Sequence, residues 1–539
     1  MKKILALLLT LAILLMAAGC GAATPDAQGG TQEGDIISDA IDTSEKSEVS
    51  TFGLSYAPAY GLNPYECTDL ANRTIISLLY ESLFTVTSNF SVEPVLCDTY
   101  TVSEDQTTYT FTLLDGVYFA DGSELTALDV VESYSAARGS AVYGTRLMYV
   151  YSVTALDNRT VQIQLGTPYE NLPLILDIPI VSAATVTSTT PMGTGPYYTS
   201  VSETETKLLP NSHWWQEYNA AVTVESITLV ETDSPADIRD DFEYGTTGVV
   251  CTDPNSSAYA DYHCDYELWN CSTTIMDFIG FNAYYGMFSD ANLRAAFTYI
   301  INRDTIATDV YEGYAEPAVL PCNPLSPQYE PELAAEYDYN PEKFKAVVNT
   351  FEGLGTARLL VCSTDPGRLA AAQVIADTAA EYGLEIEIDA RPAAEFTYMV
   401  YQGNYDLYYG QVRLPPNFDL TNFFNGSSLS NGGIENAATV GLCKEALENS
   451  GNYYSLYESI LESGAICPVL FKSYAVYATR GIITNMIPAV DNVFHTSHGR
   501  PITDAIPVEE EAPVEASEEA AAETEGAEGS ELVAEETTQ

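Results

Sequence analysis

The order of apolar and polar residues predicts an alternation of strands and helices from residue 51 onward. Alternate positions place Phe52, Leu54 and Tyr56 on one face of a predicted strand, which runs into a turn near Pro64. Apolar residues then recur three and four positions apart, which predicts an amphipathic helix. The positions of that helical face are Ile75, Ile76, Leu78, Leu79 and Leu83.

A second pattern, between residues 109 and 131, predicts a hairpin followed by a helix. Residues 109–113 alternate with period two, and Asp115-Gly116 predicts a tight turn with positive φ at the glycine. Residues 117–119 are then expected to return as the second strand. Thr126 with Asp129 three positions later is close to a capping box, so we expect a helix to begin there.

The later part of the chain has the pattern of an α/β unit. Residues 359–361 and 384–388 are predicted strands, and residues 367–382 between them are a predicted helix. Residues 289–303 carry an apolar helical stripe, which we interpret as core. The stripe consists of Leu293, Ala296, Phe297, Ile300 and Ile301.

The first fifty residues have the pattern of an export signal and a tether. Two lysines precede the apolar run 4–16, and small residues lead directly to Cys20. This arrangement resembles a bacterial lipobox, which implies a signal peptide at 1–19 and a lipidated Cys20; the alternative is an ordinary cleaved signal. Residues 20–50 would then form a flexible tether to a membrane.

Composition indicates a folded, strongly acidic protein. The chain has 539 residues, 46% of them hydrophobic, with 76 Asp plus Glu against 21 Lys plus Arg, a net charge of −55. Such a charge repels phosphates, so we expect no nucleic-acid partner. The segment 507–539 is predicted to be an acidic disordered tail. Nine cysteines remain after Cys20, and their pairing stays open.

Several separated motifs resemble the signature of the family 5 extracellular solute-binding proteins, the oligopeptide- and dipeptide-binding lipoproteins of ABC importers. Their order and spacing both match, although Ser82 stands where glycine is usual. The matching segments are 62–64 (LNP), 79–84 (LYESLF), 109–122 (YTFTLLDGVYFADG), 125–131 (LTALDVV), 193–198 (GTGPYY), 209–215 (LPNSHWW), 281–282 (FN) and 289–303.

This resemblance implies an α/β, two-lobed, periplasmic-binding-protein-like (type II) fold with an additional inserted domain. Ligands would bind in the cleft between the lobes, and closure would be a hinge motion. Lobe I is expected at 51–79, 194–280 and 481–506, the inserted domain at 80–193 and lobe II at 281–480. The expected partners are an ABC permease with its ATPase and a short peptide or other small solute, with the receptor a monomer held on the extracytoplasmic face of the cell membrane.

The candidate ligand-binding residues lie in the loop 411–424 and near the predicted hinge. In peptide-binding members of the family this loop carries an Asp that pairs with the peptide's α-ammonium. Alignment places Pro416 at that position, so either Asp419 takes the role through a loop shift or the role is absent. Arg413 could clamp a carboxylate, or form a surface ion pair, and Asp419 could instead cap a helix. The further candidates are Asn282, Tyr284, Tyr285 and Tyr65.

Motifs for enzymatic chemistry are missing from the sequence. It contains no G-x-x-x-x-G-K-[ST], no G-x-S-x-G and no H-E-x-x-H, and its four histidines form no strong metal pattern. We therefore expect a binding protein with no cofactor and no metal. The open alternatives are the same transport role for a sugar or a chelated metal, and a surface sensor or adhesin that has lost transport.

Overall fold

The computed structural model describes residues 51–216, 224–256, 262–483 and 486–495. The predicted signal peptide at 1–19, Cys20, the tether and the acidic tail at 507–539 lie outside these residues. Among the described residues, no helix combines the length and the apolar character needed to cross a membrane.

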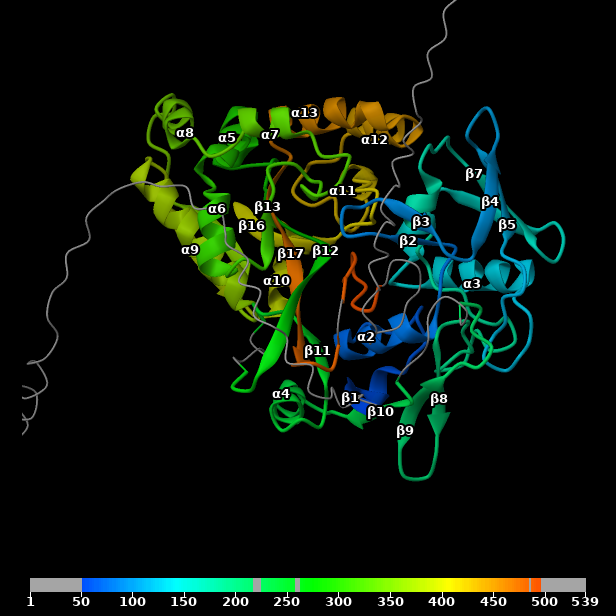
Figure 1. Cartoon of the computed structure of the whole chain (residues 1–539). Coiled ribbons are helices and arrows are strands. Elements are labelled where there is room, and N and C mark those ends of the chain that lie inside the picture. Colours follow the sequence, from blue (N-terminus) through cyan, green and yellow to red (C-terminus); the bar gives the residue numbers. More distant parts are fainter. Residues whose placement is uncertain (1–50, 217–223, 257–261, 484–485, 496–539) are drawn as a thin grey trace, which may run out of the picture. The chain divides into compact units, whose positions relative to one another are not determined.

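One large mixed sheet runs through the described structure (Figure 1). Eleven described strands belong to it, and its two ends are built from different parts of the chain. The order is β15 (Ile386–Arg391), β14 (Ala357–Cys362), β16 (Leu407–Arg413), β12 (Tyr266–Phe281), β17 (Ile466–Thr479), β11 (Val249–Thr252), β1 (Thr51–Tyr56), β10 (Ser226–Glu231), β9 (Thr206–Pro210) and β8 (Tyr197–Val201), with β13 (Ala315–Pro317) beside β17.

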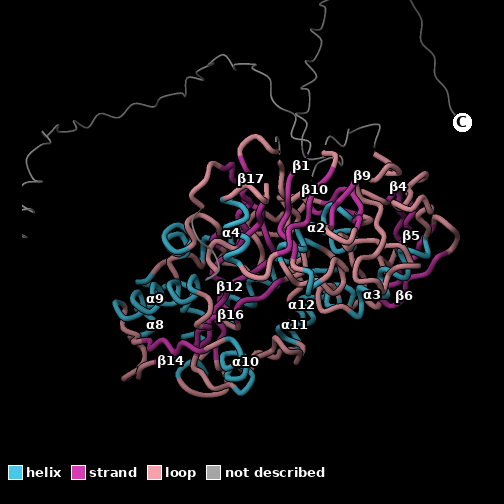
Figure 2. Tube along the Cα trace, turned by 90° about the horizontal axis from the view of Figure 1, so that it is seen from below, coloured by secondary structure: helices cyan, strands magenta, loops and turns pink. Residues whose placement is uncertain are grey.

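Two long antiparallel strands, β12 and β17, join the two ends of this sheet. β12 also pairs with β16 on its other side, and β17 also pairs with β11. The β12–β17 register shifts between Ser272 and Met276, which bends the pair where it passes from one end of the sheet to the other. Figure 2 shows β12 beside β16. This is the two-lobed α/β arrangement that the sequence predicts.

At one end of the sheet, β14, α9 and β15 form a parallel crossover unit. The strands β14 and β15 pair in parallel from Ala357 with Ile386 to Cys362 with Arg391. Because parallel neighbours need a crossover, the helix α9 between them packs on the sheet, with Ala372 and Ile375 fully buried. The predicted strands and helix at 359–388 are therefore confirmed.

Residues 84–165 build two small sheets and one helix. Four strands follow the order β4 (Cys97–Val102), β5 (Thr108–Leu113), β7 (Thr160–Leu165) and β6 (Val150–Ala155), and β2 (Phe84–Val86) pairs with β3 (Val92–Pro94). Helix α3 (Ala127–Gly139) begins at the predicted capping box, since the Thr126 amide donates to Asp129 Oδ2 at 2.8 Å.

The predicted hairpin between residues 109–113 and 117–119 is wrong. The turn at Gly116 has the expected positive φ of 73°, but the chain leaves the sheet after it. Both edges of β5 are already occupied, by β4 and β7. Tyr118 instead forms an isolated bridge with Glu124. Strands distant in sequence therefore exclude the local partner.

The remaining helices cover the sheet and connect its strands. The apolar stripe predicted at 289–303 is buried as expected, but the helix breaks into α5, a 3₁₀ turn and α6, where Asn302 caps the new start through Thr305 N at 3.2 Å. The helices are α2 (Leu70–Leu79), α4 (Pro235–Glu243), α5 (Ala291–Ala296), α6 (Arg303–Thr305), α7 (Pro331–Glu336), α8 (Pro341–Val348), α9 (Pro366–Glu381), α10 (Ala393–Gln402), α11 (Thr421–Phe424), α12 (Ala437–Glu448) and α13 (Tyr453–Ser463).

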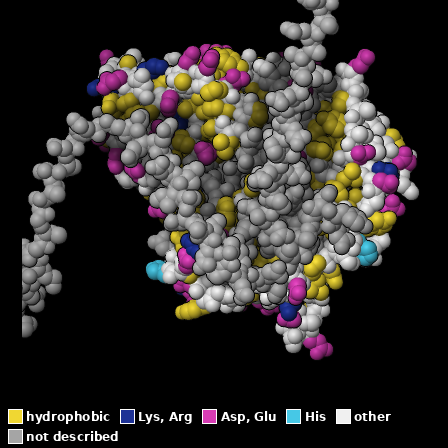
Figure 3. Space-filling model, viewed as in Figure 1, with side chains coloured by type: hydrophobic (Ala, Val, Ile, Leu, Met, Phe, Trp, Pro, Cys, Tyr) yellow, Lys and Arg dark blue, Asp and Glu magenta, His cyan; other side chains and the backbone are white. Residues whose placement is uncertain are grey.

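The cysteines within the described residues are free thiols, and most are buried. Acidic side chains are scattered over the described surface, with few Lys or Arg between them (Figure 3). The charge imbalance of the sequence therefore also marks the folded surface.

Candidate functional site

Helix α2 presents one polar face to a hollow in the structure. The helix begins at Asp69, whose Oδ1 accepts a hydrogen bond from Asn72 N at 3.0 Å. Its opposite face, which includes Ile75 and Leu78, is buried in the core. Positions three and four apart share a helix face, so the side chains toward the hollow follow from the spacing. They are Arg73, Ile76, Ser77 and Tyr80.

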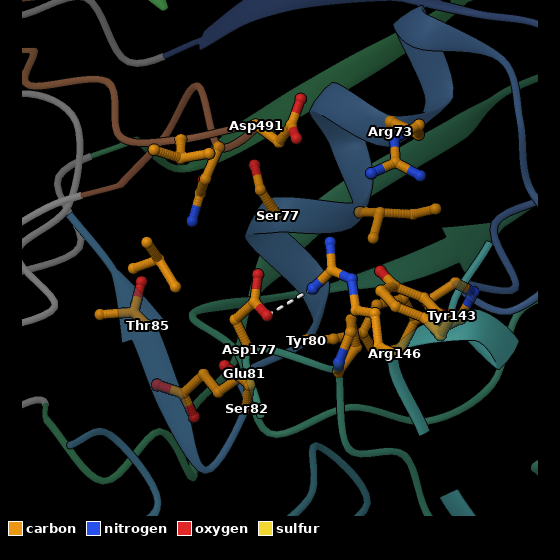
Figure 4. A pocket seen from close by; sticks show the side chains of 16 residues that line it. Arg73, Ser77, Tyr80, Glu81, Ser82, Thr85, Tyr143, Arg146, Asp177 and Asp491 are labelled. Carbon is orange, nitrogen blue, oxygen red and sulfur yellow. Dashed lines mark hydrogen bonds and ion pairs between the residues drawn. The ribbon is translucent and has the colours of Figure 1, made fainter. Parts of the chain in front are cut away.

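The hollow holds about 710 Å³ of space and combines elements that are far apart in sequence. Figure 4 shows the polar face of α2 together with Thr85 of β2, Arg146, Asp177 and Asp491. Further lining comes from Pro64, Glu81, Ser82, Val86, Tyr143, Pro179, Val490 and Asn492. This volume includes space open to solvent, so the enclosed part of the hollow is smaller.

Arg146 is the best-anchored charge in this pocket. It lies on a short 3₁₀ turn, Gly144–Leu147, and its side chain is only 7% exposed. Its Nη1 lies 2.5 Å from Asp177 Oδ1, and its guanidinium carbon lies 5.2 Å from the centre of the Tyr143 ring. A buried guanidinium needs such partners, because the pair offsets the cost of removing both charges from water.

Arg73 is differently placed. Among the described residues its guanidinium forms no ion pair, although its positive charge acts to lower the pKa of Asp491 and of Tyr143. Figure 4 shows Arg73 reaching from α2 above Tyr143, on the same side as Arg146. The pocket therefore holds a guanidinium that has no carboxylate partner among the described residues.

A tight turn near the end of the described chain brings Asp491 to the pocket. Ala489 and Asn492 close the turn with mutual backbone hydrogen bonds, and Asp491 adopts a φ of 57°. The Asp491 amide donates to Ser272 O of β12 at 2.9 Å, which fixes the turn to the large sheet. Its carboxylate pairs with Arg413 through Oδ1, whereas Oδ2 is buried and has no hydrogen-bond partner among the described residues.

The Asp491 carboxyl is held in its charged form. Burial acts to raise its pKa, but the positive charges of Arg413 and Arg73 outweigh burial and hold the pKa of Asp491 below its usual range. Arg146 contributes in the same direction. The Asp491 carboxyl is therefore a fixed negative charge of this pocket at neutral pH.

Three sequence motifs converge on Glu81 beside this pocket. Its carboxylate accepts hydrogen bonds from Thr194 Oγ1 at 2.8 Å and from the indole Nε1 of Trp214 and of Trp215, both at 3.1 Å. Burial raises the pKa of Glu81 to about 6, and these three donors moderate the rise. The motifs at 79–84, 193–198 and 209–215 therefore meet at one buried carboxyl.

The glycines of the 193–198 motif allow the chain to touch the end of α2. A Cβ added at Gly193 would lie 2.0 Å from Leu79 O, and one at Gly195 would lie 2.7 Å from Leu78 O. The Gly195 amide donates to Leu79 O at 3.1 Å, so it satisfies a carbonyl at the helix end. No side chain larger than hydrogen fits there without displacement.

The predicted residues Arg413 and Asp419 both lie near this pocket but outside its lining. Arg413 engages Asp491 and donates through Nη2 to Tyr474 Oη at 2.9 Å. Asp419 Oδ1 accepts from Thr421 N at 2.9 Å, at the start of α11. Asp419 also lines a smaller hollow of about 280 Å³, whose wall it shares with Arg146.

The other predicted site residues are engaged elsewhere. Tyr65 is buried, and its hydroxyl donates to Pro179 O at 2.7 Å. Asn282 is buried at the end of β12 and donates to Gly403 O at 3.0 Å. Tyr284 and Tyr285 are 70% and 56% exposed on the surface near that amide. The structure does not bring these four into the charged pocket, and their ligand-binding roles stay predictions.

The sequence analysis missed the residues that charge the pocket, namely Arg73, Arg146, Asp177 and Asp491. One signal was available for the first of them. Arg73 interrupts an otherwise uncharged helical pattern, and arginine and lysine together number only 21 in the chain. The described residues contain no group of three His, Cys, Asp or Glu that could hold a metal ion.

Comparison with known proteins identifies the class. The model of the bacterial extracellular solute-binding proteins, family 5 (middle region), matches residues 91–433. The chain belongs to this family of solute-binding proteins. The resemblance inferred from the separated motifs is thereby confirmed, and the family is one of binding proteins.

Individual relatives agree with this membership. The glutathione-binding protein GsiB of Shigella flexneri is 26% identical over 308 residues, which are 53% of this chain and 58% of that protein. The match therefore spans little more than half the length of this curated relative. The crystal structure of the ABC transporter substrate-binding protein CtaP from Listeria monocytogenes has a TM-score of 0.69 at 17% identity, with 83% of this chain and 98% of that chain covered. MppA, a periplasmic murein tripeptide binding protein in an unliganded open form, has a TM-score of 0.67 at 18% identity, with 83% and 96% covered.

Proposed function

We propose that this chain is the solute receptor of an ABC importer and that it binds a small molecule carrying a carboxylate, foremost a short peptide, in the pocket lined by α2 and Arg146. The observation that carries the proposal is Arg73, a guanidinium with no ion pair among the described residues, facing about 710 Å³ of space. A planar guanidinium binds a carboxylate through two parallel hydrogen bonds.

Arg73 is the charge of the pocket that favours such a ligand. The lining holds two arginines and three acidic residues, Glu81, Asp177 and Asp491, and Arg146 is already paired with Asp177. In a chain this acidic, an arginine with no ion pair among the described residues is a local attraction for an anionic group. A relative named as a glutathione-binding protein and a structural neighbour named as a murein tripeptide binding protein point to peptide-like ligands, which carry carboxylates.

The transport role rests on the family and on the start of the sequence. A lipidated Cys20 followed by the segment 21–50 would hold the receptor near a permease on the extracytoplasmic face of the membrane. A binding protein needs only to bind and to close around its ligand, and micromolar affinity corresponds to about 8 kcal/mol. No covalent chemistry is required.

A thermal-shift screen of the full chain against di- to pentapeptides, sugars and metal chelates tests the proposal. A ligand at 100 times its dissociation constant adds about 2.7 kcal/mol to the free energy of unfolding. We expect peptides with a free carboxylate to raise the melting temperature, and the same peptides as C-terminal amides to raise it much less. A sugar that raises it while every peptide leaves it unchanged would contradict the peptide assignment.

A pair of variants locates the site. Arg73→Gln is expected to weaken peptide binding at least tenfold while it leaves the melting temperature of the free protein nearly unchanged, because Arg73 has no described ion pair to lose. The matched control is Arg239→Gln, which removes an arginine from helix α4 outside this pocket. Equal affinity of both variants for the peptide would place the ligand elsewhere.

A further inference from the structure

The turn that carries Asp491 places a carboxylate of the protein where the sequence predicts a ligand's carboxylate. Arg413 was a candidate clamp for a bound carboxylate, and in the structure Asp491 occupies it. Tyr474 takes a second donor of the same guanidinium at 2.9 Å. Arg413 is therefore already neutralised by the chain itself.

The turn is built to hold this carboxylate in place. Its closing bonds join Ala489 and Asn492, and Cys271 Sγ donates to Ala489 O at 3.3 Å. Together with the bond from the Asp491 amide to Ser272 O, the Cys271 bond ties the turn to β12 at Ala489 and at Asp491. Val490 and Asn492, its neighbours, line the same pocket.

Asp491 changes the number of cations in the pocket that lack a counter-ion. The cations at or directly behind the wall are Arg73, Arg146 and Arg413, and the acidic residues of the lining are Glu81, Asp177 and Asp491. Glu81 directs its carboxylate to Thr194, Trp214 and Trp215. Without Asp491 the pocket would offer two cations lacking a counter-ion, Arg73 and Arg413; with Asp491 it offers one.

We propose that Asp491 is a specificity-determining residue: by masking Arg413 it limits the pocket to ligands with a single carboxylate and rejects those with a second one. This inference rests on the proposed function, since it concerns the same pocket. Because Arg413 is already ion-paired with Asp491, a second ligand carboxylate would find no free cation there.

Two dipeptides of nearly equal shape test the proposal. Alanyl-glutamine and alanyl-glutamate differ by one side-chain charge, so their affinity ratio, measured by calorimetry on the full chain, isolates that charge. We expect the wild type to prefer alanyl-glutamine. Asp491→Asn should shift the ratio at least tenfold toward alanyl-glutamate, because Arg413 becomes available. An unchanged ratio in this variant would overturn the proposal.

Two further variants guard against a purely structural explanation. Arg413→Gln removes the masked cation and leaves Asp491 in place, so the ratio should move in the opposite direction, toward alanyl-glutamine. Asp265→Asn deletes an acid of the same type in the exposed pair with Arg480, and the ratio should stay at the wild-type value. A shift of equal size and sign in all three variants would also contradict the proposal.

A ligand-independent measurement separates this proposal from the proposed function. Phenylglyoxal labels accessible arginines, and peptide mapping by mass spectrometry reports the rate at each one. Arg413 should label several-fold faster in Asp491→Asn than in the wild type or in Asp265→Asn. If neither dipeptide binds but Arg413 is unmasked in this way, the peptide assignment fails and the masking stands; equal labelling rates overturn the masking itself.

Discussion

Helix α2 borders two hollows of similar size but different character, one beside Arg73 and Ser77 and the other beside Leu70 and Ala71. One is the charged pocket of about 710 Å³ against Arg73, and the other holds about 810 Å³ between α2, α4 and β11. The second hollow is lined largely by aliphatic groups such as Leu70, Ile238 and Val249. Its arginine, Arg239, pairs with Asp240 at 2.6 Å, and both side chains are well exposed. The comparison shows that position in the fold, more than residue type, decides what a charge contributes.

The largest expected effect tests the difference between the two hollows by removing the arginine from each. Arg146→Gln leaves Asp177 largely buried without its partner, so we expect a loss of about 3–5 kcal/mol in the free energy of unfolding. Arg239→Gln breaks an exposed pair and should leave the free energy of unfolding nearly unchanged. Urea denaturation measures both. Similar losses in the two variants would refute the distinction between the hollows.

The second prediction concerns the wall behind the charged pocket. Gly193→Ala would place a Cβ 2.0 Å from Leu79 O, and displacing the helix end should destabilise the protein by about 1–3 kcal/mol. It should also weaken ligand binding, because Tyr80 follows that helix end. The control is Gly139→Ala at the end of α3, where the added Cβ meets nothing within 4 Å and the change should be neutral or slightly stabilising.

The third prediction uses the raised pKa of Glu81. Because the folded protein holds this proton more tightly than the unfolded chain, the contribution of Glu81 to stability is present below pH 4.5 and is lost as the pH rises through about 6. The loss is roughly 1–2 kcal/mol. Glu81→Gln removes this titration, so the difference in unfolding free energy between the variant and the wild type should change over that window. A constant difference from pH 4 to 7 would show that Glu81 does not titrate there.

The smallest expected effect comes from adding an apolar side chain beside each hollow. Ala71→Leu adds apolar surface to the second hollow, which we expect to raise the free energy of unfolding by up to about 1 kcal/mol and to leave peptide affinity unchanged. Ser77→Leu makes a similar addition on the face of α2 that points toward the charged pocket. Only this second variant should lower peptide affinity in calorimetry. Equal effects of both on affinity would mean that the ligand also reaches the second hollow.

The parts of the fold that the sequence predicts well are those fixed by nearby residues. The capping box at Thr126, the crossover unit at 359–388 and the first strand at residue 51 all depend on spacing within one element. The hairpin after Gly116 failed because its partner positions were taken by β4 and β7, and local turn chemistry carries no information about that competition.

The charged pocket was beyond sequence reasoning for a similar reason. Arg73 and Asp491 lie near opposite ends of the folded chain, and the sequence around neither residue predicts that the two line the same pocket. Arg413 could be recognised as a candidate carboxylate clamp from its loop, but the fact that Asp491 already holds it is a property of the three-dimensional arrangement. The candidates Tyr65 and Asn282 were suitable in type, yet the fold commits both to backbone carbonyls.

The strands β12 and β17 also determine whether this protein can be produced as separate fragments. The two strands pair with each other, β12 also pairs with β16 of one end of the large sheet, and β17 also pairs with β11 of the other end. Dividing the chain near residue 281 would give one fragment that ends in β12 but lacks β16 and β17. The other fragment would contain β16 and β17 but lack β12. Neither product would bury its strand edges, so dissection into separately expressed halves should yield aggregates, whereas mixing both fragments during refolding offers a route to complementation.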